Sequence, residues 1–511
     1  MKTNNTITII LLLLTSTVWA QNKFERALAS QGVSFLYQNV VSLDNGSSVA
    51  WIDKERLSYQ QGDQVFKDSK GQIFQEMGLV ENTNADMIIG MDQSGKPYWT
   101  KTIYQEEGKI LGMVEGEENE IICVLLVHEQ EVLDNWILME TNKTSQEKEV
   151  QTPIKSKSQV QVPYGTRLMP GINLVTLSSA GSVLKSIPVR NLTNLDEMDI
   201  EGCVFQPNGT IILNGFIKGN TLASNIEPPV FSGTGGGDFI LAIAQTGIPL
   251  WGDIVHYRDP SCCTQTTEGS AVSVAPDGTV YFAGSYFNGG IFSNKLQTLT
   301  PRKYEIKPHD LAEMYVVSYT GKGKIRWIKT ANAESRFHAL SANNQGVVLG
   351  FYSQKKNLFG MKVDPTLDET HTTHLVKLNS NGNSEWLKST QFQRIHQLKN
   401  LDGVKHACVS SYKLGFKEGK RIGQVEIPEE DDLVVFEIDA NSYVLKYWSA
   451  SLLLSREKIQ LCQVDKRNNT FLIAFETWCG LPLDLNKVDS SLPSVKCYGG
   501  TTIIGEIKLL D

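Results

Sequence analysis

Two adjacent cysteines, Cys262 and Cys263, are the residues whose types and spacing most directly suggest chemistry. A disulfide between neighbouring cysteines is a strained, rigid turn, and such a bond can be redox-active. Two free thiols, or disulfides to cysteines elsewhere, are the alternatives. The residues just before the pair, Tyr257, Arg258 and Asp259, complete a candidate binding segment.

The other six cysteines divide into one candidate disulfide pair and four candidate buried thiols. Cys479 and Cys497 flank a long polar stretch and form the better pair. Closing a loop of that length contributes about 3 kcal/mol in the chain-entropy account. The remaining four lie in apolar, strand-like contexts, where a thiol acts as a small hydrophobic group. They are Cys123, Cys203, Cys408 and Cys462.

Metal-ligating residues are present but do not converge. His371 and His374 form the closest histidine pair, yet at this spacing they enter a strand on different sides. A zinc-type site needs three or four converging ligands, so no metal site is expected there. The acidic runs at residues 115–120 and 429–432 could bind a hard cation such as calcium. They lack the spacing of an EF-hand loop, and a solvated surface is the simpler interpretation.

Composition and the N-terminus indicate the compartment. The chain has 511 residues, is 41% hydrophobic and carries a formal net charge of -8, which favours a folded core and disfavours non-specific nucleic-acid binding. Residues 1–20 are typical of a secretory signal peptide, with an apolar centre at residues 9–14 and small residues at Val18 and Ala20. That centre is too short to span a bilayer. We therefore expect residues 21–511 to be exported as one domain without a membrane span, to the periplasm or the exterior.

The elements that must position these residues follow from an internal repeat. One recurring phrase is an apolar strand, a turn with Gly, and a Trp four residues after that Gly. The clear copies place Gly and Trp at Gly95–Trp99, Gly247–Trp251, Gly323–Trp327 and Gly382–Trp386. In two degenerate copies we assign Leu184 and Leu445 to the Trp position. Because these tryptophans recur at one place in the pattern, we expect them to pack between repeats and not to bind a ligand.

A second phrase, a tight turn followed by an apolar strand, precedes each copy of the first. Asn-Gly and Asp-Gly turns between apolar runs predict type I′ hairpins, in which both central residues have positive φ. These turns fall near residues 46, 120, 209, 278, 346, 403 and 469. The mature chain thus divides into seven units of about 70 residues, each a four-stranded antiparallel meander.

The third strand of each unit is apolar on both faces, as in residues 239–244. A strand covered on both sides reads as a continuous apolar run, whereas a sheet with one wet face alternates. Four-stranded sheets stacked around a ring cover both faces of one another. The sequence therefore predicts an all-β fold, a seven-bladed β-propeller of four-stranded antiparallel blades.

The unit resembles the β-propeller repeat of exported proteins from Bacteroidetes-type bacteria. The residues that carry the resemblance are 277–284 and 238–251, and about four of the seven units are good copies. The resemblance implies a propeller and export, and it implies no particular activity. A ring must also be closed to protect its edge strands. We predict that an N-terminal strand at residues 33–37 completes the last blade beside residues 501–511.

The longer connections between strands all lie on one face of such a ring, where binding residues usually occur. The sequence lacks a nucleophile elbow, a phosphate-binding loop and a dinucleotide fingerprint, so no catalytic residue and no cofactor is assigned. We expect a monomeric, non-catalytic scaffold that binds a protein or a glycan. The alternative is a propeller enzyme, either a glycan lyase or hydrolase or a quinone-dependent dehydrogenase. Gly95, Trp99 and the paired cysteines resemble the dehydrogenase family, but Asp92 stands one residue too close to Gly95.

Overall fold

A computed structural model of the chain describes 26 strand-containing or connecting stretches less than the whole sequence, and all structural statements below refer to those residues. They are 26–31, 36–54, 65–68, 73–76, 85–92, 97–104, 108–128, 170–190, 198–217, 237–257, 270–286, 290–293, 303–305, 313–331, 335–363, 373–401, 405–411, 421–422, 425–427, 433–450, 459–465, 470–484 and 496–508. Every regular element within them is a β-strand. The search of these residues found no helix of the length and apolarity needed to cross a membrane. The predicted all-β class is confirmed.

The described stretches number 23, as that list gives them; the figure of 26 in the paragraph above is an error.

The described strands form large antiparallel sheets, five of four strands and two of six, which we number 1 to 7 in chain order. Sheet 1 contains β2 (Leu36–Ser42), β3 (Ser48–Lys54), β6 (Ala85–Met91) and β7 (Pro97–Tyr104). Sheet 2 contains β8 (Gly108–Glu115), β9 (Ile121–Val127), β10 (Gly171–Leu177) and β11 (Val183–Pro188). Sheet 3 contains β12 (Met198–Phe205), β13 (Ile211–Ile217), β14 (Gly237–Ile243), β15 (Pro249–Tyr257), β18 (Gly290–Ser293) and β19 (Lys303–Glu305).

The remaining sheets follow the same order from first to fourth strand. Sheet 4 contains β16 (Ser270–Val274), β17 (Val280–Tyr286), β20 (Glu313–Tyr319) and β21 (Ile325–Ala331). Sheet 5 contains β22 (Ser335–Asn343), β23 (Gly346–Ser353), β26 (Thr373–Asn379) and β27 (Ser384–Thr390). Sheet 6 contains β28 (Arg394–Asn400), β29 (His406–Ser411), β32 (Leu433–Ile438) and β33 (Val444–Ala450). Sheet 7 contains β34 (Ile459–Asp465), β35 (Thr470–Asp484), β36 (Lys496–Lys508), β1 (Arg26–Gln31), β4 (Val65–Asp68) and β5 (Ile73–Glu76).

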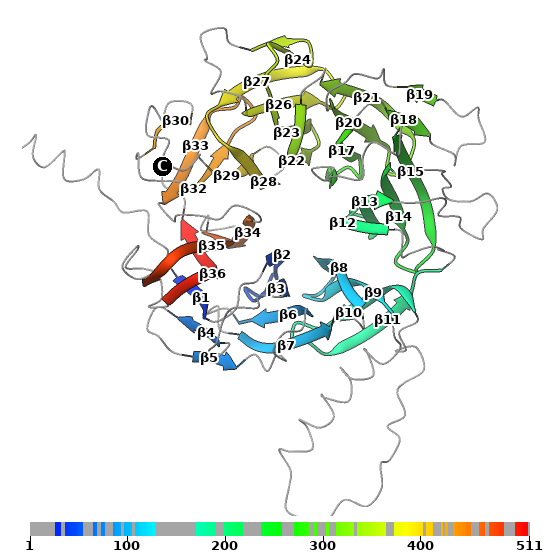
Figure 1. The fold of residues 1–511 in the computed structure, drawn as a ribbon. Coiled ribbons are helices and arrows are strands. Elements are labelled where there is room, and N and C mark those ends of the chain that lie inside the picture. Colours follow the sequence, from blue (N-terminus) through cyan, green and yellow to red (C-terminus); the bar gives the residue numbers. More distant parts are fainter. Residues whose placement is uncertain are drawn as a thin grey trace, which may run out of the picture.

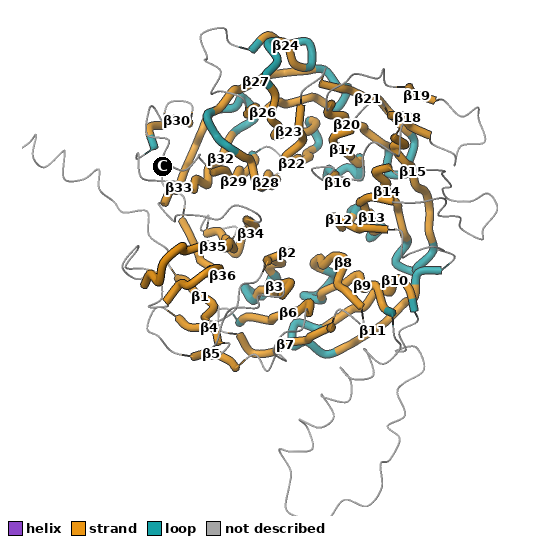
Figure 2. The backbone as a smooth tube through the Cα atoms, viewed as in Figure 1, coloured by secondary structure: helices purple, strands orange, loops and turns teal. Residues whose placement is uncertain are grey.

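The sheets are arranged around a common centre, with the first strand of each sheet innermost (Figure 1; Figure 2). The innermost strands contact one another in cyclic order, from β2 through β8, β12, β16, β22 and β28 to β34, which contacts β2 again. Each sheet is therefore covered by two neighbours, and this explains why the third strands are apolar on both faces. All seven residues of β14, for example, are buried.

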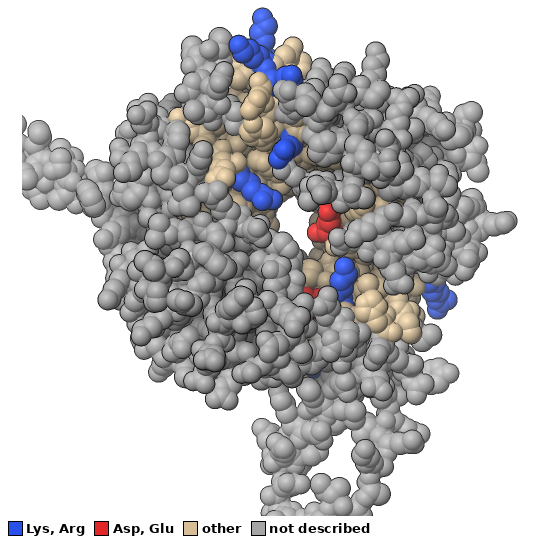
Figure 3. Space-filling model, in the orientation of Figure 1, with Lys and Arg blue, Asp and Glu red and all other residues tan. Residues whose placement is uncertain are grey.

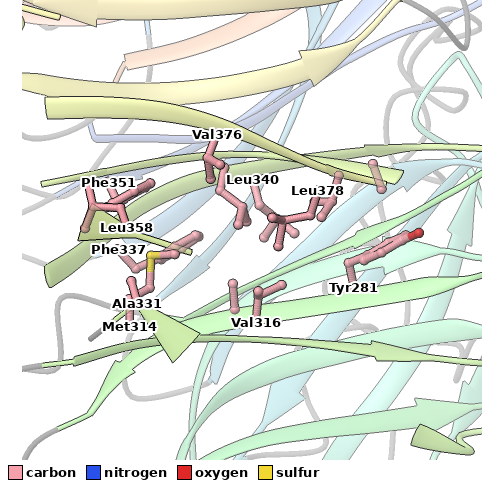
Figure 4. Close-up of a cluster of buried hydrophobic side chains, with 14 of the residues drawn as sticks. Tyr281, Met314, Val316, Ala331, Phe337, Leu340, Phe351, Leu358, Val376 and Leu378 are labelled. Carbon is pink, nitrogen blue, oxygen red and sulfur yellow. The ribbon is translucent and has the colours of Figure 1, made fainter. Parts of the chain in front are cut away.

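The core is divided into clusters, each filled from two neighbouring sheets. The cluster between sheets 4 and 5 shows this clearly, with Met314 and Val316 from one sheet facing Phe337, Leu340 and Val376 from the other (Figure 4). Burying an aliphatic or aromatic side chain of this size contributes about 1.5–3 kcal/mol. The same arrangement recurs between sheets 1 and 2, 2 and 3, 3 and 4, and 5 and 6.

The tight turns lie where the sequence predicts them, but most have a different geometry. At Gly46, Gly209 and Gly278 only the glycine has positive φ, between 79° and 82°. The side chain of the preceding Asn or Asp accepts a hydrogen bond from the backbone two residues on, as Asn208 does from Thr210 at 3.0 Å. These are type I turns followed by a left-handed residue, so the predicted type I′ geometry is wrong for them. The turn at Glu118 and Asn119 has positive φ at both residues.

A repeated contact joins neighbouring sheets at their outer strands. The indole N–H of Trp99, in β7, donates to the carbonyl of Ser179, in the third-to-fourth-strand turn of sheet 2, at 2.8 Å. Equivalent bonds join Trp251 to Gly321 at 3.2 Å, Trp327 to Ser380 at 2.9 Å and Trp386 to Ala440 at 2.8 Å. We call this the indole–turn contact. The tryptophans pack between repeats, as the sequence predicts.

Each indole also covers the left-handed residue of the turn to which it donates. A Cβ atom added to Gly323, where φ is +81°, would lie 2.4 Å from the ring of Trp251. Gly181 and Gly382 would meet the rings of Trp99 and Trp327 in the same way. Glycine is thus required twice at this position, once for its backbone conformation and once for space.

The assignment of Leu184 and Leu445 to the Trp position is wrong by one residue. Trp99 lies opposite Gly90 in the register of sheet 1, and the equivalent residue of sheet 2 is Lys185, opposite Thr176. In sheet 6 it is Lys446, opposite Glu437. The fourth strands carry a register shift just before this position, so that Leu184 is the extra, exposed residue of a bulge.

The N-terminal strand beside β36 is not residues 33–37. Arg26 to Gln31, which form β1, pair with β36, with Leu28 opposite Ile504. Leu36 and Tyr37 instead pair with β3 in sheet 1, while residues 33–35 lie outside the described residues. The hairpin turn at Gly46 explains the difference, because sheet 1 needs its own first strand immediately before that turn.

Pairing of β1 on both edges predicts that a proline there destabilises the protein. β1 lies between β36 and β4, so Leu28→Pro removes a backbone donor from a strand with neighbours on both sides. We expect a cost of about 3 kcal/mol or more, measured as the free energy of unfolding in urea. Leu28→Ala keeps the donor and is the matched control. Equal stability of the two variants would contradict this pairing.

The indole–turn contact predicts a difference between two similar glycine substitutions. Gly323 and Gly278 have φ of +81° and +82°, but a Cβ at Gly278 has no atom within 4 Å. Gly323→Ala should therefore lower the free energy of unfolding by about 1–3 kcal/mol more than Gly278→Ala, because only the first variant displaces an indole. Chemical denaturation measures both. In a Trp251→Ala background the difference should shrink.

Candidate functional site

The strand connections separate into two faces. First-to-second and third-to-fourth strand turns lie at one end of the sheets, which we call the turn face. Second-to-third strand connections and the links between sheets lie at the other end, which we call the loop face. The connection after β9 is the longest, at residues 128–170. Long connections on a rigid scaffold are a common location of binding residues, so the loop face is the candidate functional face.

The candidate binding segment begins on this face. Tyr257 is the last residue of β15 and lies opposite Gly290 of β18. Arg258, Asp259, Cys262 and Cys263 lie outside the described residues. The vicinal disulfide and the binding role of this segment stay predictions.

Several stretches expected to be long loops contain additional strands. Residues 288–312 include β18 and β19, which extend sheet 3. Two small ribbons lie in other connections: β24 (Asn357–Leu358) with β25 (Met361–Lys362), and β30 (Arg421–Ile422) with β31 (Val425–Glu426). The stretch at 476–500 was expected to be a loop, but β35 continues to Asp484 and β36 begins at Lys496.

The two cysteines of the candidate disulfide lie on neighbouring strands but are not direct partners. Cys479 is opposite Gly499, and Cys497 is opposite Leu483, across a register shift. The predicted bond between them stays untested, since their side chains lie outside the described part of the structure. The pairing of β35 with β36 already brings these two segments together without a disulfide.

Three of the predicted buried thiols are described, and all three are free. Cys123 and Cys408 are buried, while Cys203 is half-buried. Burial raises the pKa of Cys203 and of Cys408 to about 12, and it raises the pKa of Cys123 further, with the nearby Cys203 as a smaller cause. Thiols with such pKa values hold their protons at neutral pH, so these cysteines are core residues and not nucleophiles.

His374, the described member of the histidine pair, has its ring nitrogens engaged by the protein. Nδ1 lies 2.9 Å from the Ser389 hydroxyl, and Nε2 lies 2.9 Å from the Ser353 carbonyl. The side chain is 1% exposed. His374 is thus a hydrogen-bonded core residue of sheet 5.

Basic side chains gather where β22 and β28 begin at the loop face. Arg336 and Arg394 are each the first or second residue of their strand, and both are exposed. Both guanidinium groups act on His338, whose pKa is lowered to about 3, first by burial and then by Arg394 and Arg336. His338 is therefore neutral at physiological pH and can accept a hydrogen bond. Figure 3 shows basic and acidic residues beside the central opening.

Side chains of one sheet satisfy the exposed edge of the next innermost strand. Nδ1 of His338 accepts a hydrogen bond from the backbone N–H of Ile395 at 3.4 Å. The carboxylate of Glu201 accepts one from the N–H of Ser270 at 2.6 Å. Both acceptors are the extra residues of bulges in β22 and β12. A bulge re-aims its side chain, and here it directs an acceptor to the neighbouring sheet.

Sequence patterns missed this group of residues. Arg336, His338 and Arg394 belong to no motif and are separated by up to 58 positions along the chain. The available signal was their position, because each follows the link into a new innermost strand. Such a position lies at the loop-side end of the central opening whatever residue occupies it.

Comparisons with known proteins give structural similarity only. No family model and no curated protein matches the chain. A protein of unknown function from Dyadobacter fermentans is similar over 95% of this chain and 99% of its own, with 11% identity and a TM-score of 0.37. The Dos1 propeller covers 94% and 95%, with 7% identity and a TM-score of 0.38. A polysaccharide lyase of family 25, an ulvan lyase, covers 87% and 92%, with 9% identity and a TM-score of 0.38.

Identities and TM-scores this low do not assign a function. The class of the protein follows from its own geometry, namely antiparallel four-stranded sheets set radially around a centre. The chain is accordingly a β-propeller-like protein.

The lowered pKa of His338 predicts a pH-dependent loss of stability. The unfolded chain protonates this ring near its ordinary value of 6.5, whereas the folded protein resists protonation until about pH 3. Stability should therefore fall as the pH drops below 6.5. Between pH 7 and pH 5, His338→Asn should lose about 1–2 kcal/mol less stability than the unmodified protein, measured by urea denaturation. His128→Asn is the exposed control, and an equal loss in His338→Asn and the unmodified protein would contradict the assignment.

Proposed function

We propose that this protein is an exported, seven-bladed β-propeller that serves as a non-catalytic binding scaffold through its loop face. In this proposal the seven numbered sheets are the blades, and β1 closes the ring by completing the last blade. The cyclic contacts of the innermost strands and the pairing of β1 with β36 support it. Export rests on the signal-peptide pattern of residues 1–20.

The observation that carries the binding role is the basic pair at the loop-side end of the central opening. Arg336 and Arg394 stand at the starts of two innermost strands that contact each other. Guanidinium groups bind carboxylate and sulfate groups with directed hydrogen bonds. The chain as a whole is acidic, with a net charge of -8, so a local basic pair is selective for an anionic group and does not attract polyanions in general.

We infer a ligand with carboxylate or sulfate groups, of which an anionic glycan is the candidate to test. The neutral ring of His338, between the two arginines, adds a hydrogen-bonding group without a third charge. No step of catalysis is needed for this role, and none is assigned.

The basic pair predicts charge-selective binding. Isothermal titration calorimetry with polygalacturonate should show saturable binding to the mature protein, while neutral dextran should show none. Arg336→Gln combined with Arg394→Gln should weaken binding at least tenfold, because two charge-assisted contacts are removed. Lys388→Gln, an exposed residue of β27, is the control for net charge. Equal binding by the double variant and this control would contradict the proposed site.

A further inference from the structure

The boundary between sheets 2 and 3 lacks the indole that fills the other boundaries of its kind. In sheets 1, 3, 4 and 5 the Trp position of the fourth strand holds an indole that reaches the next turn. In sheet 2 this position is Lys185, whose side chain is exposed. The cross-strand neighbour is Thr176, a small residue comparable with Gly90, Ala242 and Ser318 beside the indoles.

A groove of about 340 Å³ lies at this boundary. Its apolar wall comes from strands of sheets 2 and 3, and its polar residues come from the turns and from Lys185. The lining residues that matter here are Ile122, Leu174, Ile211, Thr176 and Gln245. The groove is on the turn face and is distinct from the basic pair on the loop face.

An unused acceptor marks the place of the missing indole N–H. Ser179, Gly321, Ser380 and Ala440 each hold the second position of their turn, and their carbonyls accept the indole bonds. Gln245 holds that position in the turn of sheet 3 and lines the groove. Among the described residues, no hydrogen bond to the Gln245 carbonyl is present.

The left-handed glycine of this turn is covered by the chain itself. A Cβ added to Gly247 would lie 2.4 Å from the carbonyl oxygen of Pro188 and 3.0 Å from Ile187. A ring in the groove therefore cannot stack on Gly247 as Trp251 stacks on Gly323. It would lie over Thr176 instead, beside the aliphatic part of Lys185.

The charges around the groove favour a cation. Glu117 and Glu120 contribute two carboxylates from the turn between β8 and β9, and Lys185 contributes one ammonium group. The lining thus has a formal charge of -1. A ligand ammonium near the two carboxylates is attracted, whereas a ligand carboxylate is repelled. The Lys185 ammonium can also lie against the face of an aromatic ring.

We propose that this groove is a binding site for a small aromatic amine, with a planar ring of about indole size and a primary ammonium group. The ring replaces the missing indole, its N–H donates to the carbonyl of Gln245, and the ammonium faces Glu117 and Glu120. The volume, the acceptor and the charges each favour this class independently.

Tryptamine is the probe, measured by isothermal titration calorimetry on the mature protein, with indole and indole-3-acetate as the comparison ligands. We expect saturable binding of tryptamine, weaker binding of indole and none of indole-3-acetate. Combined Glu117→Gln and Glu120→Gln should lower the tryptamine affinity at least fivefold and leave indole binding unchanged.

Filling the groove from within provides the decisive variant. Lys185→Trp should abolish tryptamine binding and raise the melting temperature, because an indole then occupies the site as in the other sheets. Lys329→Trp, at an exposed lysine of β21, is the matched control and should bind tryptamine normally. The proposal is overturned if the unmodified protein does not bind tryptamine, if Lys185→Trp binds it as well as Lys329→Trp does, or if indole-3-acetate binds equally well. Circular dichroism confirms that each variant is folded.

Discussion

The indole–turn contact is the interaction on which the arrangement of the sheets depends. A tryptophan of one sheet donates its N–H to a turn of the next and covers a left-handed residue of that turn. Sheets that pack only through apolar side chains can slide, because such contacts have little directionality. A hydrogen bond to one carbonyl and contact with one Cα fix the rotation of each sheet relative to its neighbour. The apolar clusters then supply the larger part of the stability.

The same need to satisfy exposed backbone groups organises the centre of the molecule. The innermost strands have one edge without a strand partner, and a buried unpaired N–H is costly. Acceptors from the preceding sheet serve this edge at Ile110, Ser270 and Ile395. Glu201 and His338 can do so because bulges re-aim them. Satisfying the backbone leaves the arginines at the loop-side end exposed, where they can meet a ligand.

Much of the fold could be predicted from the sequence, because the signals were local and repeated. Glycine turns and tryptophans at fixed spacing predicted four-stranded sheets and the packing of the indoles between them. Register was harder, since a one-residue bulge moved the Trp position from Leu184 to Lys185. The partner of β36 also escaped, because pairing between the two ends of the chain leaves no local signal. For the same reason Arg336 and Arg394, distant in sequence, could not be recognised as a pair.

Hydrogen exchange of the indole N–H groups tests the central account most directly. Protein labelled with ¹⁵N-tryptophan, with resonances assigned by single Trp→Phe variants, reports each group separately by NMR. The account predicts that the indole protons of Trp99, Trp251, Trp327 and Trp386 exchange about a thousandfold or more slower than those of free tryptophan, since exchange requires the sheets to separate. Exchange of these protons at the rate of free tryptophan would contradict it.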